Sequence, residues 1–149
     1  WLKDLGMEDS HVAKVLAKHP ELLGLSLDTK MKPTVQWLKD LDMKVPQVAK
    51  VLAKFPQLLG YSLEENLKPM VQWLKDLGMD DPQVAKVLPK FPQLLSFSLE
   101  ENLKPIVQWL KDLGMEDSHV AKVLAKHPEL LGLSLDTKMK PTVQWLKDL

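Results

Sequence analysis

The chain has 149 residues, of which 45% are hydrophobic and 27% charged, and its 20 acidic residues balance 20 basic ones. Every basic residue is lysine, and neither arginine nor cysteine occurs. This composition excludes disulfides, a thiol nucleophile, a cysteine-ligated metal site and bidentate arginine contacts to phosphate or guanine. No apolar run reaches the roughly 20 residues that a membrane-spanning helix needs, so no membrane partner is expected. No targeting segment is visible.

The chain is built from a repeated unit of 36 residues. Residues 1–41 are identical to residues 109–149, which indicates a recent duplication or an engineered concatemer. Asp42 and Pro89 stand where the other copies carry glycine and alanine, and such irregular choices favour natural repeats. The motif Trp-Leu-Lys-Asp-Leu marks the period and begins at Trp1, Trp37, Trp73, Trp109 and Trp145.

Each unit opens with a predicted helix that is apolar on one side. Asp81-Pro82 is typical of an N-cap followed by proline in the first helical position. The i, i+3, i+4, i+7 spacing of a half-buried helix is carried by Val48, Val51, Leu52 and Phe55. A proline then ends each helix and opens a short link, for which one 3₁₀ turn is predicted, at Pro20, Pro56, Pro92 and Pro128.

A second helix is predicted to begin at Ser62, with Glu65 completing a capping box. Pro69 lies inside this helix and predicts a kink, and Gly78 is predicted to end it in the left-handed conformation. The apolar face of the helix is formed by Leu63, Leu67, Met70, Val71, Leu74 and Leu77.

Two helices per unit and no strand pattern predict an all-α solenoid of helix–turn–helix repeats, in which each repeat buries its apolar stripe against its neighbours. We expect one array over residues 1–149, with whole repeats at 9–44, 45–80 and 81–116 and a nearly whole one at 117–149. Residues 1–8 have the sequence of the tail of a preceding repeat. Neither end carries a polar capping repeat, so we expect a piece of a longer array whose ends associate with each other.

The repeat contains the motif Val-x2-Val-Leu-x3-Pro-x-Leu-Leu over 84–95 and the motif Ser-Leu-x5-Pro-x-Val-x-Trp-Leu-x2-Leu-Gly over 98–114, and both recur along the whole chain. In these motifs the repeat resembles that of the mitochondrial transcription termination factor (mTERF) family. The resemblance implies two antiparallel helices and a short 3₁₀ helix per repeat, wound into a superhelix. It also implies a protein of mitochondria or chloroplasts that binds double-stranded DNA or organellar RNA. This chain differs from the usually basic members of the family in being neutral and free of arginine.

No residue pattern predicts catalysis, a metal site or a cofactor. His11 and His19 are eight residues apart, which would turn their side chains about 80° from each other on a helix, and no third ligand lies beside them. Tandem carboxylates such as Glu64-Glu65 are typical of the first turn of a helix, where the helix dipole favours them. The tryptophan column flanks the leucine stripe, which favours core packing over a ladder for stacked bases.

One set of lysines differs from the others in having no acidic partner within its own helix. Two lysines in each first helix, at i and i+4, share a helical face with a histidine or glutamine and point away from the apolar stripe. This set forms the candidate nucleic-acid site, which we call the lysine stripe: His11, Lys14, Lys18, Gln47, Lys50, Lys54, Gln83, Lys86, Lys90, His119, Lys122 and Lys126.

The sequence therefore favours a non-enzymatic, nucleic-acid-binding repeat protein in which lysines contact phosphates and read little base sequence. The alternative is a protein-interaction or self-assembling scaffold without affinity for nucleic acid. Zero net charge favours the scaffold, whereas the segregation of the stripe lysines favours nucleic-acid binding.

Overall fold

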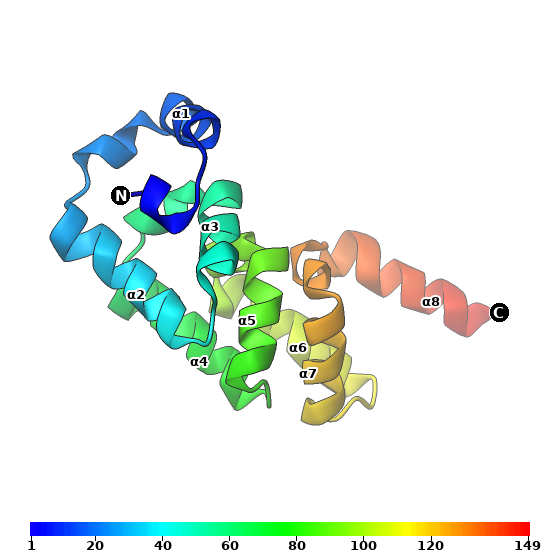
Figure 1. Cartoon of the computed structure of the whole chain (residues 1–149). Helices are drawn as coiled ribbons and strands as arrows, with labels where there is room; N and C mark the ends of the chain where they lie inside the picture. The colour runs from blue at the N-terminus through cyan, green and yellow to red at the C-terminus, as the bar shows by residue number, and fades with distance from the viewer.

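The computed structural model describes all 149 residues and contains eight α-helices and no strand, which confirms the predicted all-α solenoid (Figure 1). Short 3₁₀ and π-helical turns connect the helices. The first helices of successive repeats are α1 (Asp9–Lys18), α3 (Val45–Lys54), α5 (Asp81–Lys90) and α7 (Asp117–Lys126). The second helices are α2 (Lys32–Asp40), α4 (Lys68–Asp76), α6 (Lys104–Asp112) and α8 (Lys140–Asp148).

The first helices form one layer of the solenoid. Figure 1 shows α3, α5 and α7 side by side, and α5 contacts both of the others. The second helices α2, α4 and α6 each pack on the first helix of the following repeat, which is α3, α5 and α7 respectively. The first repeat is packed more loosely, because α1 has no comparable contact with α3, and the 3₁₀ turn Lys3–Leu5 packs on α3.

A single hydrophobic cluster of 36 buried residues runs through all four repeats, from Leu5 to Met139. Its centre consists of the leucines and valines that the helical spacing predicts, and Val48, Leu74 and Leu88 are each 0% exposed. Burial falls off towards the C-terminus, where α8 has no buried residue. The apolar stripes of the central repeats are therefore covered from both sides, as expected for stacked repeats.

The N-cap of α5 lies one residue earlier than the sequence predicts. Asp80, not Asp81, accepts a hydrogen bond from the Gln83 backbone N–H (2.9 Å), while the Gln83 side chain accepts one from the Asp80 N–H (3.0 Å). Asp81 instead forms an ion pair with Lys75 of α4 at 2.7 Å. The N-cap lies at the same repeat position in α1, α3 and α7, at Glu8, Lys44 and Glu116, so the start of the helix does not depend on the residue type there.

The second helix of each repeat begins with a π-helical turn, Leu63–Leu67 in the second repeat, and α4 continues from Lys68. Pro69 therefore lies in the first turn of α4, directly after the π-helical turn, where a residue without an N–H is tolerated, and it does not interrupt a regular α-helix. Ser62 Oγ accepts a hydrogen bond from the Glu65 N–H (3.1 Å), as predicted. The return bond comes from Asn66, whose Oδ1 accepts from the Ser62 N–H (3.2 Å), so the predicted role of Glu65 is wrong.

Gly78 ends the second helix as predicted, with a φ of 112°. The Gly78 N–H donates to the Lys75 carbonyl (2.9 Å) and the Met79 N–H to the Leu74 carbonyl (3.2 Å), which together make a Schellman motif. Asp42 occupies the same place in the first repeat and also has a positive φ, of 68°. It is the one residue other than glycine in this conformation.

Candidate nucleic-acid interface

The eight lysines of the lysine stripe lie on the first helices, two on each, and all are exposed to solvent. None of them forms an ion pair, because the nine ion pairs of the molecule involve other lysines or histidines. Lysines four residues apart lie on the same side of a helix, so each repeat presents two positive charges together.

Seven of the other twelve lysines form ion pairs within the protein. Lys32, Lys68, Lys104 and Lys140 pair with the acidic residue four positions earlier, as in the Lys68–Glu64 contact of 2.6 Å. In the column at the end of the second helix, Lys3, Lys75 and Lys111 pair with the aspartate six residues later, whereas Lys39 and Lys147 form no ion pair. Ion pairs thus hold most of the lysines outside the stripe and none of the eight within it.

A groove between α1 and α3 collects several members of the stripe. Its volume is about 240 Å³, and its walls include His11, Lys14 and Lys18 from the α1 side and Lys54 from α3. His19, at the C-terminal cap of α1, also lines it. This groove exists because α1 stands apart from α3, and it can receive an anionic group between two repeats.

Two of the stripe lysines interact with the following repeat. Lys54 donates a hydrogen bond to the Pro89 carbonyl of α5 at 3.1 Å. The pKa of the Glu129 carboxyl is lowered mainly by a hydrogen bond from its own backbone and then by the His127 side chain, and the charge of Lys90 contributes the least. The lysines nearer the helix N-termini, such as Lys50 and Lys86, have no such interaction and are freer to contact a ligand.

The histidine and glutamine members of the stripe differ from one another in the structure. Gln47 and Gln83 each accept a hydrogen bond from the backbone N–H three residues earlier, at 2.9 and 3.0 Å. Their amide oxygens therefore cap their own helices, and only their amide N–H groups remain for a ligand. The imidazole rings of His11 and His119 are exposed and make no hydrogen bond within the protein.

The tryptophan column does not form a stacking platform. Trp1, Trp37, Trp73 and Trp109 are half-buried and pack against the hydrophobic core, as the sequence predicts. Trp145 is 62% exposed because no repeat covers α8. Rings that pack sideways on a core do not offer a free face to a base.

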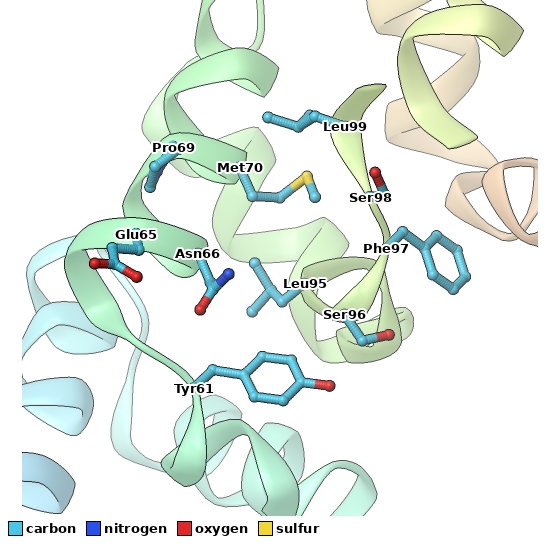
Figure 2. Close-up of a pocket in the computed structure, with 10 residues that line it drawn as sticks. All are labelled: Tyr61, Glu65, Asn66, Pro69, Met70, Leu95, Ser96, Phe97, Ser98 and Leu99. Atoms are coloured by element: carbon cyan, nitrogen blue, oxygen red, sulfur yellow. The ribbon is translucent and has the colours of Figure 1, made fainter. Parts of the chain in front are cut away.

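A second set of cavities lies at the N-terminal turns of the second helices and was not predicted from the sequence. One, of about 430 Å³, is shown in Figure 2, where Asn66, Met70 and Leu95 face a common space and the Phe97 ring points away. An equivalent cavity of about 510 Å³ occurs one repeat later. Both contain a glutamate and no lysine in their walls, so neither suits a phosphate. The only sequence signal for them is the aromatic pair Tyr61 and Phe97, one period apart.

The donor atoms for a metal site are not gathered anywhere in the molecule. No group of three or more histidine, aspartate or glutamate side chains comes together in the geometry of a metal site. His19 and His127 instead each contact a glutamate two residues later, at 3.2 Å. None of the helices combines the length and the apolar character that crossing a bilayer requires.

The fold and the unpaired lysines define the class of the molecule, a helical-repeat protein with a positively charged surface along its first helices. The mTERF family model matches residues 1–148, and the chain belongs to this family. Membership indicates a helical-repeat factor of the nucleic-acid-binding, termination-factor type from a family that is generally non-enzymatic and associated with organelles. No curated protein sequence matches the chain.

Proposed function

We propose that the chain binds double-stranded DNA or RNA through the lysine stripe and acts as an organellar gene-expression factor in mitochondria or chloroplasts. The observation that carries this proposal is the segregation of lysines: the eight stripe lysines are exposed and unpaired, whereas most other lysines form ion pairs. The organellar location rests on the family alone.

All basic residues of the chain are lysines, and this determines how the protein recognises a nucleic acid. An ammonium group contacts phosphate as a point charge, whereas reading a guanine needs the two parallel N–H groups of a guanidinium. The stripe therefore supplies affinity and positions the ligand along the solenoid, with little selection among base sequences. Zero net charge weakens long-range attraction and makes binding depend on these local contacts.

A salt titration tests the proposal directly. If each of the four repeats neutralises one phosphate of a duplex, the slope of log K against log salt should be about −3.6, since each contact contributes about −0.9. Changing Lys50, Lys54, Lys86 and Lys90 to glutamine should reduce this slope by about half, because two repeats lose their contacts. The binding constant at each salt concentration is measured by fluorescence anisotropy, with labelled DNA and RNA duplexes and with an analogue whose backbone is uncharged.

The matched control changes Lys68 and Lys104 to glutamine, since both are held by Glu64 and Glu100 on the second helices. This control should leave the slope nearly intact and weaken the protein by only about 0.3–0.5 kcal/mol per pair. A slope that is lost in the control and kept in the stripe variant would place the binding surface on the second helices.

The second candidate function is a protein scaffold without affinity for nucleic acid. It is favoured by the zero net charge of the chain. Equal binding of the charged duplexes and the uncharged analogue, or no binding at all, would support the scaffold and overturn nucleic-acid binding.

A further inference from the structure

The two large cavities at the N-terminal turns of the second helices are built alike and lie one repeat apart. The first, of about 430 Å³, lies between the second and third repeats, and the next, of about 510 Å³, lies between the third and fourth. Phe97 lines both of them, so the two cavities are neighbours along the array. Neither cavity includes a residue of α1 or α8, so both belong to the interior of the array.

The inner walls of these cavities are apolar and held in place by the core. In the first cavity Met70 and Leu95 are each 2% exposed and face the space together (Figure 2). The Tyr61 ring forms the wall below them in this view, and the buried Phe55 ring holds it edge to face, with 5.6 Å between the ring centroids. Phe97 has the same place in the next cavity, where another phenylalanine ring holds it at the same distance. A ligand therefore meets a preformed wall of apolar and aromatic groups.

Each cavity has one free carboxylate at its rim. Glu65 in the first cavity and Glu101 in the second are exposed, and neither takes part in any ion pair of the molecule. The preceding residues Glu64 and Glu100 differ from them, because each is held by the lysine four residues later. No lysine lines either cavity, so the charge of the free carboxylate is not compensated there.

An amide hydrogen-bond donor faces the same space. The Asn66 Oδ1 atom accepts a hydrogen bond from the Ser62 N–H at 3.2 Å, and Asn102 repeats this contact with the Ser98 N–H at the same distance. This bond orients the side chain and leaves its NH₂ group free, and Figure 2 shows the amide nitrogen of Asn66 pointing into the cavity. An amide NH₂ group donates hydrogen bonds to carbonyl oxygens, such as those of a peptide backbone.

We propose that the two cavities bind an extended, basic segment of another protein, with one lysine or arginine side chain entering each cavity. The aliphatic stem of such a side chain packs on the apolar wall, and its charged end reaches the rim carboxylate and the face of the aromatic ring. The asparagine NH₂ group holds a backbone carbonyl of the segment. Helices in contact lie about 8–10 Å apart and an extended chain advances about 3.3 Å per residue, so basic residues about three positions apart can enter successive cavities.

The charge at the rim favours this partner over a nucleic acid. A carboxylate repels the phosphates that accompany an entering base, and the cavity walls contain no lysine to offset that repulsion. The lysine stripe lies on the first helices, whereas the cavities lie at the beginning of the second helices. A basic protein segment and a nucleic acid would therefore occupy different surfaces of the solenoid.

Fluorescence anisotropy with a panel of labelled peptides tests the proposal. Each peptide carries two arginines in an alanine and serine sequence, separated by one to four residues. We expect at least one spacing to bind, and the double variant Glu65→Gln, Glu101→Gln to weaken its binding by about tenfold, because two ion pairs are lost. The matched control is Glu64→Gln, Glu100→Gln, which changes the net charge equally at neighbouring positions and should change the affinity by less than about twofold. No binding at any spacing, or equal weakening by both variants, overturns the proposal.

Cross-linking identifies the carboxylates that the segment contacts. Carbodiimide should join a peptide with lysines in place of the arginines to Glu65 and Glu101, and mass spectrometry of the digested product locates the links. Both side chains are exposed, so their replacement by glutamine should leave the helix content unchanged by circular dichroism. Links confined to carboxylates outside the two cavities overturn the proposal.

Two further titrations separate this partner from the nucleic acid. Peptide binding should persist in the variant whose four stripe lysines of α3 and α5 are changed to glutamine, so failure of the peptide and failure of the nucleic acid are separate results. Single-stranded DNA and RNA oligonucleotides then replace the peptide. If Glu65→Gln, Glu101→Gln abolishes oligonucleotide binding and no peptide binds, the cavities take bases and the proposal is wrong.

Discussion

Asp42 is held in the left-handed conformation at a place where the other three copies carry Gly6, Gly78 and Gly114. A residue with a Cβ atom is strained there, because the atom approaches the neighbouring carbonyl oxygen. The local geometry is kept nonetheless, since the Asp42 N–H donates to the Lys39 carbonyl at 3.1 Å. The end of α2 thus tolerates a residue that the fold does not favour.

Replacing Asp42 by glycine should raise the free energy of unfolding by about 1 kcal/mol, because the strain of positive φ is relieved. Urea denaturation followed by circular dichroism measures the change. The reverse test is Gly114→Ala, where an added Cβ meets no atom within 4 Å, so only backbone strain is introduced. This variant should be less stable by a similar amount, and an unchanged midpoint in both variants would contradict the strain argument.

At the residue scale, the sequence predicts where helices are capped better than it predicts which side chains interact with each other. The capping serine and the terminal glycine are confirmed because each acts through its own backbone neighbourhood. The choice between Asp80 and Asp81 failed because two adjacent aspartates suit an N-cap equally well by residue type, and all four first helices begin at the same repeat position whatever residue precedes them. Likewise, that Gln47 and Gln83 cap their own helices became visible only with the side-chain geometry.

The helices themselves follow from local periodicity, and this is why their order and their buried faces could be predicted. The π-helical turn before each second helix could not be predicted from the sequence, because a single widened turn is too short to change the spacing of the apolar residues noticeably. Its presence moves Pro69 to the beginning of α4, where proline fits without breaking hydrogen bonds.

Leu74 in α4 and Leu146 in α8 occupy the same position of the repeat, so comparing them tests how much burial by a neighbouring repeat adds to the free energy of unfolding. Leu74→Ala removes a side chain that is 0% exposed and should lower the free energy of unfolding by about 3 kcal/mol. Leu146→Ala removes the equivalent side chain of α8, which is 54% exposed, and should cost less than about 1 kcal/mol. Thermal or urea denaturation at low protein concentration compares them, and equal losses would mean that burial between repeats does not stabilise the array.

At the scale of the whole molecule, the repeat period predicts that the lysines of the stripe recur along the first helices. It does not predict how they meet the following repeat. The hydrogen bond from Lys54 to the Pro89 carbonyl depends on the rotation between successive repeats, which no residue spacing contains. The looseness of α1, and the groove that results from it, depend on the same geometry.

The stability of a linear array is a sum of repeat and interface contributions. A destabilising substitution in a central repeat should therefore divide unfolding into separate steps. Leu88→Ala, in the middle of α5, should split the single unfolding transition into two, because the repeats on either side lose their common neighbour. Calorimetry and the fluorescence of the tryptophans, which are spaced one per repeat, detect the steps. A single sharp transition shifted to lower temperature would show that the four repeats unfold as one unit.

The arrangement of contacts along the solenoid also has a consequence for how quickly the chain folds. The main contacts of each element lie within its own repeat or with an adjacent one, so the chain closes few long loops on its way to the native state. Proteins dominated by such local contacts fold within microseconds to milliseconds, far faster than sandwiches and barrels of similar size. Any of the four repeats can serve as the nucleus, and a lengthened array would acquire more starting points without a slower search.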